Sequence, residues 1–210
     1  GKGGLGNAHF KSSTNQAPRK FTNGENFEEK WIHLSLKLFA DIGIIGKPNA
    51  GKSTLLSVIS SAQPKIADYP FTTLNPVLGV IKKIDKELIV ADIPGLIEGA
   101  HEGIGLGYKF LAHIERCKVL LHLLDSSDNS CIDSYYKIRK ELSKYGKNIE
   151  NKIEIVALSK SDLCNKNQNE LSNSFETKIG VKPVFFSSFS KEGVNKLVNK
   201  LFKTTYNDTQ

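Results

Sequence analysis

The chain reads Ile42-Gly43-Ile44-Ile45-Gly46-Lys47-Pro48-Asn49-Ala50-Gly51-Lys52-Ser53 where a short apolar run meets a glycine-containing turn. The apolar run predicts a buried strand, and the residues from Lys52 to about Ser60 predict a helix. A turn of this composition between a strand and a helix is typical of a phosphate-binding loop. The alternative, a chance glycine-rich turn, is disfavoured by two motifs further along the chain.

The side chains of this loop predict how it would bind a nucleotide. Gly46 and Gly51 permit the tight path that points backbone amides, and the positive end of the helix, at a phosphate chain. Lys52 would neutralise the β- and γ-phosphates, and the Ser53 hydroxyl would ligate Mg²⁺. The predicted nucleotide-binding residues of the loop are Gly46, Pro48, Asn49, Ala50, Gly51, Lys52, Ser53 and Thr54.

A second motif, Asp92-Ile93-Pro94-Gly95, follows the apolar run 88–91. A carboxylate at the end of that predicted strand can hold the magnesium, and the Gly95 amide can meet the γ-phosphate. Asp125 is a rival, because it also ends an apolar run. Asp92 is preferred because Pro94-Gly95 follows it at the expected interval.

The third motif, Ser159-Lys160-Ser161-Asp162, follows the apolar run 153–158 and predicts the choice of base. Asp162 can accept hydrogen bonds from two guanine donors that adenine lacks, which allows discrimination by ~10⁴. Lys160 would lie along the base with its alkyl stem. The three motifs together predict a GTPase and disfavour an ATPase. A backbone amide for guanine O6 would come from Ser187, Ser188 or Phe189, where an ordinary serine-rich turn is the alternative.

The polar loop 62–76 contains Asp68-Tyr69-Pro70-Phe71-Thr72-Thr73. A threonine here can close over Mg²⁺ when the γ-phosphate is present and release it after hydrolysis. Thr72 and Thr73 are equivalent on this argument, so the choice between them stays open.

Short apolar runs alternate with helical patterns from residue 39 onward. The predicted strands are 40–45, 77–82, 88–91, 119–124, 153–158 and 184–186, and the predicted helices are 52–60, 108–116, 132–142, 170–179 and 194–202. The runs 77–82 and 88–91 flank Asp85-Lys86 and predict an antiparallel hairpin, whereas the others suit parallel strands. The predicted fold class is therefore α/β: a three-layer P-loop NTPase of the Ras-like G-domain type, with a mostly parallel sheet and ligands at the carboxyl ends of its strands.

Composition changes near residue 39 and predicts two domains, 1–38 and 39–206. Residues 1–26 hold few large apolar side chains, so we expect neither a helix nor an ordinary core strand there. Residues 31–37 alternate apolar and polar side chains, which predicts a half-buried strand. We interpret 1–38 as the end of a β-rich domain. Methionine is absent even at position 1, so we expect the chain to be part of a longer protein.

Bulk properties narrow the class of protein. The net charge of +7 suits an acidic partner such as RNA, but its lysines are scattered, so a charged, solubilising surface explains it equally well. Three widely separated cysteines with no CxxC pair disfavour a disulfide framework or a zinc site and fit a reducing cytoplasm. No apolar run approaches the roughly 18 residues that would span a bilayer, and no secretory signal opens the chain.

The residues resemble one family, the Obg GTPases. The runs 64–74 and 92–103 are similar to that family's two switches, the segments 105–107, 110–111 and 113–116 continue the likeness, and 1–19 is similar to the end of the glycine-rich Obg domain. The resemblance implies a cytoplasmic GTPase that acts on the large ribosomal subunit and its rRNA during assembly. We expect a monomer that does not bind DNA. The resemblance also implies a response to GTP, GDP and guanosine tetraphosphate, and it implies that Thr73 is the switch threonine that ligates Mg²⁺ with Ser53 and Asp92.

Differences from the usual pattern bear on mechanism. Ser159 stands where the family usually has asparagine, which predicts nucleotide binding weaker by about 1 kcal/mol. Ser188 replaces an alanine, with little expected effect. Leu96 occupies the place of the water-orienting glutamine of Ras-like proteins, so we expect slow hydrolysis.

Catalysis would then depend on Lys52, Thr73 and Asn49. In similar GTPases an asparagine at the position of Asn49 helps bind K⁺, and a role in capping the loop is the equally weighted alternative. Two other functions stay open: an accessory GTPase for RNA modification, and a nucleotide-sensing module with negligible turnover.

Overall fold

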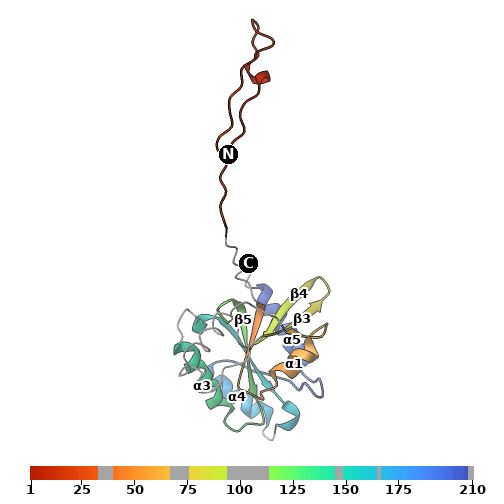
Figure 1. Ribbon diagram of the computed structural model, residues 1–210. Helices are drawn as coiled ribbons and strands as arrows, with labels where there is room; N and C mark the ends of the chain where they lie inside the picture. The colour runs from red at the N-terminus through yellow and green to blue at the C-terminus, as the bar shows by residue number, and fades with distance from the viewer. Residues whose placement is uncertain (33–39, 67–75, 94–113, 145–148, 165–166, 208–210) are drawn as a thin grey trace. The chain divides into compact units, whose positions relative to one another are not determined.

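The computed structural model describes residues 1–32, 40–66, 76–93, 114–144, 149–164 and 167–207 (Figure 1). The chain divides into two compact units, Gly1–Leu36 and Lys37–Gln210. Among the helices of the described residues, none is long and apolar enough to cross a membrane.

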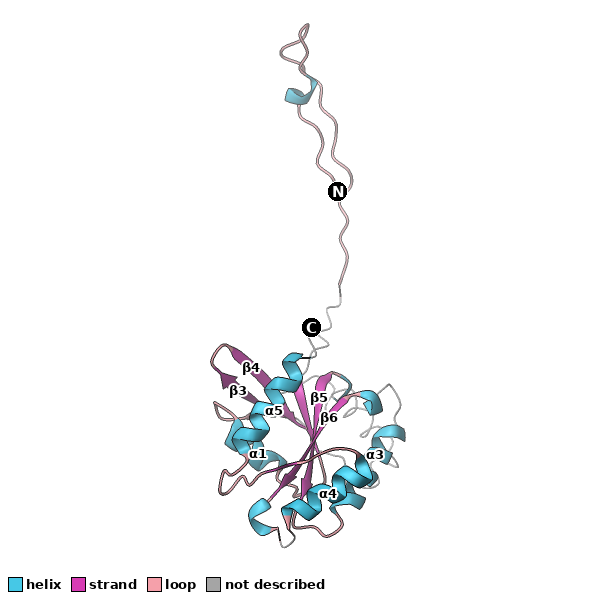
Figure 2. Cartoon of the chain, turned by 180° about the vertical axis from the view of Figure 1, so that it is seen from behind, coloured by secondary structure: helices cyan, strands magenta, loops and turns pink. Residues whose placement is uncertain are grey.

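The second unit is built on one seven-stranded sheet with the order β2-β3-β4-β1-β5-β6-β7. Figure 2 labels its strands β3, β4, β5 and β6. The strands are β1 (Ala40–Ile45), β2 (Lys65–Ile66), β3 (Val77–Lys83), β4 (Lys86–Asp92), β5 (Cys117–Asp125), β6 (Ile153–Ser159) and β7 (Val184–Phe185). The central strand β1 pairs in parallel with β4 and β5, and β6 and β7 continue the parallel part. β3 and β4 form the antiparallel hairpin, so the predicted fold class is confirmed.

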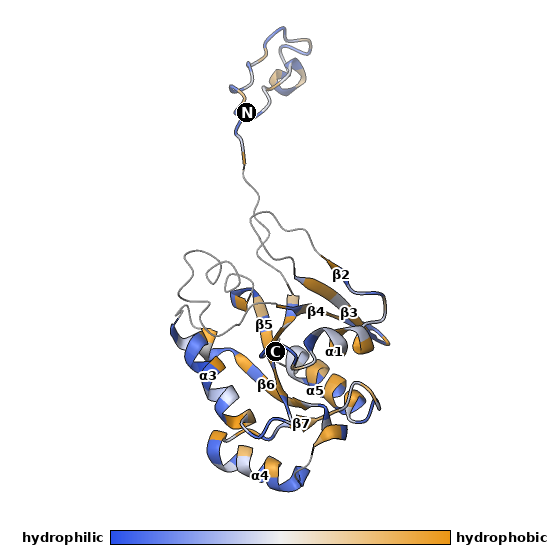
Figure 3. Cartoon of the chain, turned by 60° about the horizontal axis from the view of Figure 1, so that its bottom comes forward, coloured by the Kyte–Doolittle hydropathy of each residue, from blue (hydrophilic) through white to orange (hydrophobic). Residues whose placement is uncertain are grey.

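The described helices cover both faces of the sheet and make three layers. They are α1 (Lys52–Ile59), α3 (Cys131–Lys144), α4 (Gln168–Ile179) and α5 (Val194–Asn207), with single 3₁₀ turns η2 (Ile149–Asn151) and η3 (Ser161–Leu163). α1 and α5 share one hydrophobic cluster with β1, whereas α3 and α4 pack in two clusters on the other face. Hydrophilic and hydrophobic residues alternate along α3, α4 and α5, as amphipathic covering helices require (Figure 3).

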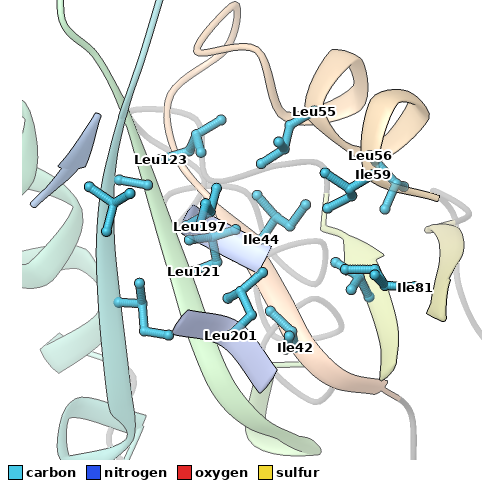
Figure 4. Packing of buried hydrophobic residues seen from close by; sticks show 14 of the residues in the cluster. Ile42, Ile44, Leu55, Leu56, Ile59, Ile81, Leu121, Leu123, Leu197 and Leu201 are labelled. Atoms are coloured by element: carbon cyan, nitrogen blue, oxygen red, sulfur yellow. The ribbon is translucent and has the colours of Figure 1, made fainter. Parts of the chain in front are cut away.

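The core beneath α1 positions the loop that precedes this helix. Leu55, Leu56 and Ile59 of α1 meet Ile42 and Ile44 of β1 and residues of α5 (Figure 4). All but Ile59 of these five are completely buried, and Ile59 is 8% exposed. Burial of such side chains contributes roughly 1.5–3 kcal/mol each, which holds the start of α1 against the end of β1.

Two sequence expectations for the second unit need correction. The segment 62–76, predicted as loop throughout, contains β2, which pairs antiparallel with β3 through Lys65 opposite Leu78. A strand of two exposed residues leaves no apolar pattern to detect, because its ladder rather than burial stabilises it. Of the predicted helix 108–116, residues 108–113 lie outside the described residues.

The first unit has little buried surface in its described part. Two extended segments pair through Thr22 N–H to Leu5 O at 3.0 Å and Glu25 N–H to Lys2 O at 2.9 Å. A single 3₁₀ turn, η1 (Asn7–Phe10), lies between them, although the composition predicts no helix there. Trp31 is fully exposed and outside any strand, and so is Ile32 at 76% exposure.

The strand prediction for 31–37 is therefore wrong at its first two residues, and 33–37 lie outside the described part. Alternating polarity predicts a half-buried strand only where a core covers the apolar face, and in the described residues nothing covers Trp31.

Candidate nucleotide-binding site

The loop between β1 and α1 has a backbone that only certain residues can adopt. Gly46 has φ +154°, and a Cβ there would lie 2.4 Å from the carbonyl oxygen of Leu123, so no larger residue fits without movement. Asn49 and Gly51 follow with φ +63° and +88°, both left-handed. Asparagine and glycine are the residues that tolerate this region best, so the loop sequence matches the loop path.

Lys52 folds back over the loop that precedes it. Its Nζ donates to the carbonyl oxygens of Gly46 and Lys47, each at 3.0 Å. Burial lowers the pKa of Lys52, and the charge of Asp92 acts in the opposite direction. The ammonium group thus sits at the centre of the loop, where the sequence places a phosphate partner.

Ser53 and Asp92 meet beside the same loop. The Ser53 hydroxyl donates to Asp92 Oδ2 at 2.5 Å, and the register of Ile44 opposite Asp92 brings β4 to the end of β1. Asp92 is 4% exposed, and its Oδ1 has no hydrogen-bond partner among the described residues. A buried carboxylate oxygen without a partner costs free energy, which a cation would relieve.

These residues fit Mg²⁺, which prefers oxygen ligands and usually takes one or two protein carboxylates plus phosphates and water. No group of three or more His, Cys, Asp or Glu side chains that could hold a metal occurs in the part of the chain that is described. The remaining ligands would therefore come from the nucleotide, from water and from Thr73, which lies outside the described residues.

Ser159 connects the base-recognition motif to the phosphate loop. It ends β6, is 2% exposed, and its hydroxyl lies 2.8 Å from Ala50 O and 3.1 Å from Leu124 O. The single hydroxyl proton can serve one of these acceptors at a time. The link that the sequence predicts for a serine here is therefore made to the backbone of the loop.

Lys160 is held by an acid that the sequence suggests only as a rival magnesium ligand. Lys160 has φ +55°, and its Nζ donates to Asp125 Oδ2 at 2.5 Å. Burial alone would raise the pKa of Asp125, but hydrogen bonds from Lys160 and Ser127 outweigh it and lower that pKa below its usual value. Asp125 thus positions a predicted base-binding side chain. Asp125 ends β5 opposite Ser159 at the end of β6, and this register, which local sequence patterns do not carry, brings the side chains of Asp125 and Lys160 together.

The rest of the base-recognition motif is anchored from two sides. The Ser126 hydroxyl donates to Lys160 O at 3.0 Å, and Ser161 N–H donates to Phe186 O at 3.2 Å. Asp162 lies in η3 with an exposed side chain, and no hydrogen bond to its carboxylate occurs within the described residues. Its oxygens are therefore available to a ligand.

The turn after β7 limits which backbone N–H group could donate to guanine O6. Ser187 is completely buried, its N–H already donates to Glu192 O at 2.9 Å, and its hydroxyl accepts from Ser190 N–H. Ser188 is half-buried and Phe189 is 92% exposed. An amide donor would thus come from Ser188 or Phe189 rather than Ser187.

Several predicted residues cannot be placed. Thr73 and the run 68–73 lie outside the described residues, and so do Gly95 and Leu96. The structure thus brings together the phosphate loop, Asp92 and the base-recognition motif, and these residues come from β1, α1, β4 and β6.

Comparisons with known proteins match both units. Residues 41–160 match a family model described as 50S ribosome-binding GTPase, and residues 1–38 match one described as GTP1/OBG. GTPase Obg of Rickettsia massiliae is 55% identical over 208 residues, which cover 99% of this chain and 63% of that protein. GTPase Obg of Rickettsia felis is 56% identical over the same coverage. The chain thus spans less than two thirds of the length of these curated relatives.

Solved structures match the chain more distantly. A single-residue variant of Era from Aquifex aeolicus, bound to GDP·AlF₄⁻, has a TM-score of 0.60 at 25% identity, with 80% of this chain and 57% of that chain covered. A putative nucleolar GTP-binding protein 1 from Plasmodium falciparum also has a TM-score of 0.60, at 22% identity, with 80% and 87% covered. The second similarity concerns the fold alone.

Proposed function

Because the chain belongs to the Obg family of GTPases, we propose that it is a guanine-nucleotide switch which hydrolyses GTP slowly with Mg²⁺ and acts in assembly of the large ribosomal subunit. The observation that carries the nucleotide part is the link from Ser159 to Ala50, since it ties the base-recognition motif to the phosphate loop. The exposed Asp162 carboxylate lies three residues from that link.

The chain's own groups suggest how the nucleotide would be held. Lys52 would transfer its hydrogen bonds from the carbonyls of Gly46 and Lys47 to phosphate oxygens, which accept more strongly because they are charged. Magnesium, when bound, would neutralise charge on the β- and γ-phosphates. Ser53 and the partnerless Oδ1 of Asp92 would hold it from the protein side, with Thr73 from the first switch.

Slow hydrolysis is proposed because Leu96 has no polar group to orient a water molecule. Asn49 would supply part of the missing stabilisation by helping to bind K⁺. Its side chain is exposed at the loop and makes no hydrogen bond within the described residues, which favours a ligand role over capping. Equal hydrolysis rates in KCl and NaCl at one ionic strength would exclude this role for Asn49.

The cellular part of the proposal rests on the family. A cytoplasmic monomer would bind GTP, GDP and guanosine tetraphosphate and would bind the large ribosomal subunit without binding DNA. The match of residues 1–38 to the GTP1/OBG model favours this role over that of an accessory GTPase for RNA modification. Turnover stimulated by added 50S subunits would distinguish a working switch from a nucleotide-sensing module with negligible turnover.

The first test is a titration of the chain with fluorescent GDP and ADP in Mg²⁺ and K⁺. We expect micromolar binding of GDP and at least ~100-fold weaker binding of ADP, because adenine lacks the donors for Asp162. Asp162→Asn should weaken GDP binding by a similar factor and favour xanthosine diphosphate, whose base has a carbonyl where guanine has an amine. Asp133→Asn, on the surface of α3, is the matched control. Equal binding of GDP and ADP by the unmodified chain would refute the proposed base specificity.

A further inference from the structure

A cavity lies at the opposite end of the β3–β4 hairpin from Asp92. It has a volume of about 420 Å³ and lies between the hairpin turn and the last turns of α5, the helix beside the hairpin in Figure 2. We call it the hairpin–α5 pocket, and its lining residues are Lys83, Ile84, Asp85, Lys86, Asn199, Phe202, Lys203 and Tyr206. None of these residues belongs to the candidate nucleotide site, so a ligand here would be a second one.

The pocket carries an excess of positive charge. Lys83, Lys86 and Lys203 line it against one acid, Asp85. Lys196 and Lys200 lie on α5 at helical spacing from Lys203 and extend the basic face beyond the pocket. Burial, and to a smaller extent the charge of Lys196, lower the pKa of Lys200, so these two lysines of α5 repel each other. A polyanion would relieve that repulsion.

Two aromatic rings give the pocket flat apolar surfaces. Phe202 is only 6% exposed, whereas Tyr206 is half-buried and has its hydroxyl donating to Glu87 O at 2.9 Å. Lys86 Nζ lies over the face of the Tyr206 ring, 4.3 Å from its centre, and the Phe202 ring lies parallel to the Tyr206 ring with centres 6.1 Å apart. Lys83 Nζ donates to Asn199 Oδ1 at 2.8 Å. A base can stack on the Tyr206 ring in place of the Lys86 ammonium, which would then turn to a flanking phosphate.

The hairpin turn adds a strained residue at the rim. Ile84 has φ +38°, a conformation that costs about 1–3 kcal/mol for a β-branched residue, and its side chain is 97% exposed. Folding alone gains nothing from an exposed isoleucine in this conformation. The side chain does place an apolar surface next to Lys83 and Lys86, where a ligand could cover it.

We propose that the hairpin–α5 pocket binds a single-stranded segment of RNA, with a base stacked on Tyr206 and flanking phosphates on Lys83, Lys86 and Lys203. The inference rests on the ribosomal partner proposed above and names the part of the chain that would contact its RNA. An acidic peptide would satisfy the lysines but would offer no flat ring to replace Lys86 over the face of Tyr206. The pocket volume of about 420 Å³ lies near the lower end of the range for small-ligand sites, which begins at about 300 Å³, so we expect it to hold about one nucleotide.

The test measures anisotropy of a fluorescein-labelled 12-nucleotide single-stranded RNA with the full chain, GDP and Mg²⁺ over a range of KCl concentrations. Replacing two lysines, K86Q/K203Q, should weaken binding at least fivefold and reduce the salt slope by about 1.4, because each contact with a single strand contributes about 0.7. The control K140Q/K144Q removes the same charge from exposed positions of α3 and should change affinity less than twofold.

Two variants of Tyr206 distinguish a loss of base stacking from a loss of the fold. Tyr206→Phe keeps the ring and loses the hydrogen bond to Glu87, so RNA should bind it as it binds the unmodified chain. Tyr206→Leu removes the ring and should weaken binding about tenfold, as loss of one stacked base does. A thermal melt of each variant checks its fold.

Three outcomes would overturn the inference: no RNA binding by the unmodified chain, equal losses in K86Q/K203Q and K140Q/K144Q, or displacement of the RNA by polyglutamate at equal charge concentration. The last result would assign the pocket to an acidic protein. GDP affinity is measured in parallel on every variant and should not change. Failure of the RNA site is thereby distinguished from failure of the nucleotide site.

Discussion

The Ser159 hydroxyl stands between two carbonyl oxygens but has one proton to donate. Ala50 O is at 2.8 Å and Leu124 O at 3.1 Å, and the side chain is buried away from water. An asparagine amide carries two protons and would serve both acceptors at once. This gives a physical reason for the weaker nucleotide binding expected from serine at this position.

Ser159→Ala should lower the free energy of unfolding by about 1–3 kcal/mol, because both buried carbonyls lose their shared donor. GDP affinity should fall about fivefold, the equivalent of about 1 kcal/mol. Urea unfolding and a GDP titration measure the two effects. Ser174→Ala is the control, because that hydroxyl donates only within α4 at a partly exposed position, and it should change neither quantity. Equal losses in both variants would contradict the proposed link.

Residues of the candidate site differ in how far the sequence could reveal them. Gly46, Lys52 and Ser53 belong to one local motif, whose residue types and spacing determine its path. The pairing of Asp125 with Lys160 joins residues 35 positions apart, and it depends on the register of β5 against β6. Local patterns carry no register between strands, so the partner of Lys160 could not be predicted.

At the scale of elements, a buried polar cluster joins α3 to the sheet. His122 Nδ1 of β5 lies 2.7 Å from Glu154 Oε1 of β6, and Tyr135 of α3 donates to Glu154 Oε2 at 3.1 Å. The rings of His122 and Tyr135 stack with centres 5.0 Å apart. Burial alone would raise the pKa of Glu154, but His122, then Arg139 and Tyr135, outweigh it and hold that pKa below its usual value.

Glu154→Gln should destabilise the chain by about 2 kcal/mol at neutral pH, because it removes charged hydrogen bonds in a buried setting. A lowered carboxyl pKa in the folded state gives stability that is complete above the unfolded pKa and is lost as pH falls through the folded value. The gap between the two proteins should therefore be largest above about pH 4.5 and shrink below it. Urea unfolding from pH 3 to 7 measures the gap.

Glu87→Gln provides the comparison for that experiment. Glu87 pairs with Lys82, and both side chains are well exposed, so its replacement should cost less than about 0.5 kcal/mol. A gap for Glu154→Gln that does not change with pH would show that lost packing, and not the ionised carboxylate, causes the destabilisation.

The β3–β4 turn offers a second prediction at this scale. Ile84→Asn should raise the free energy of unfolding by about 1 kcal/mol, because asparagine tolerates positive φ and the isoleucine side chain is exposed. Ile66→Asn makes the same exchange at an exposed residue of β2, where φ is ordinary, and should be neutral or slightly destabilising. Chemical denaturation compares the two. A loss of stability in Ile84→Asn would show that its backbone is not strained.

Element boundaries show what periodicity can and cannot reveal. The strand 40–45 has its predicted limits, since all but one of its residues are buried and the run ends at Gly46. The helix predicted over 194–202 in fact continues to Asn207. The last turn of α5 is held against the β3–β4 hairpin, because Tyr206 donates a hydrogen bond to Glu87 and contacts Lys86. Periodicity along the chain contains no information on such a distant neighbour.

At the scale of the whole molecule, all three hydrophobic clusters belong to the second unit. Their buried residues run from Ala40 to Phe202. In the described part of the first unit, apolar side chains such as Phe21 and Phe27 are exposed, at 71% and 81%. The second unit therefore has the core that independent folding requires, and it contains every described residue of the candidate nucleotide site.

A chain of residues 37–210 should keep its GDP affinity and melt within about 2 °C of the full chain, which corresponds to less than about 1 kcal/mol. Differential scanning calorimetry and a GDP titration measure this. The melting curve should stay a single transition in both proteins. A loss of more than tenfold in GDP affinity would contradict the assignment of nucleotide binding to residues 39–206.

The β3–β4 hairpin has the magnesium-ligand candidate at one end and the basic turn at the other. Its paired residues run from Val77 opposite Asp92 to Lys83 opposite Lys86, and the six steps between the two ends, at about 3.3 Å each, span about 20 Å. Because the two strands are paired along their whole length, they move together as one element. A small tilt at Asp92 on nucleotide exchange would displace Ile84 at the rim of the pocket. If this displacement changes the affinity of the pocket for its ligand, occupancy of the pocket changes nucleotide affinity by the same factor.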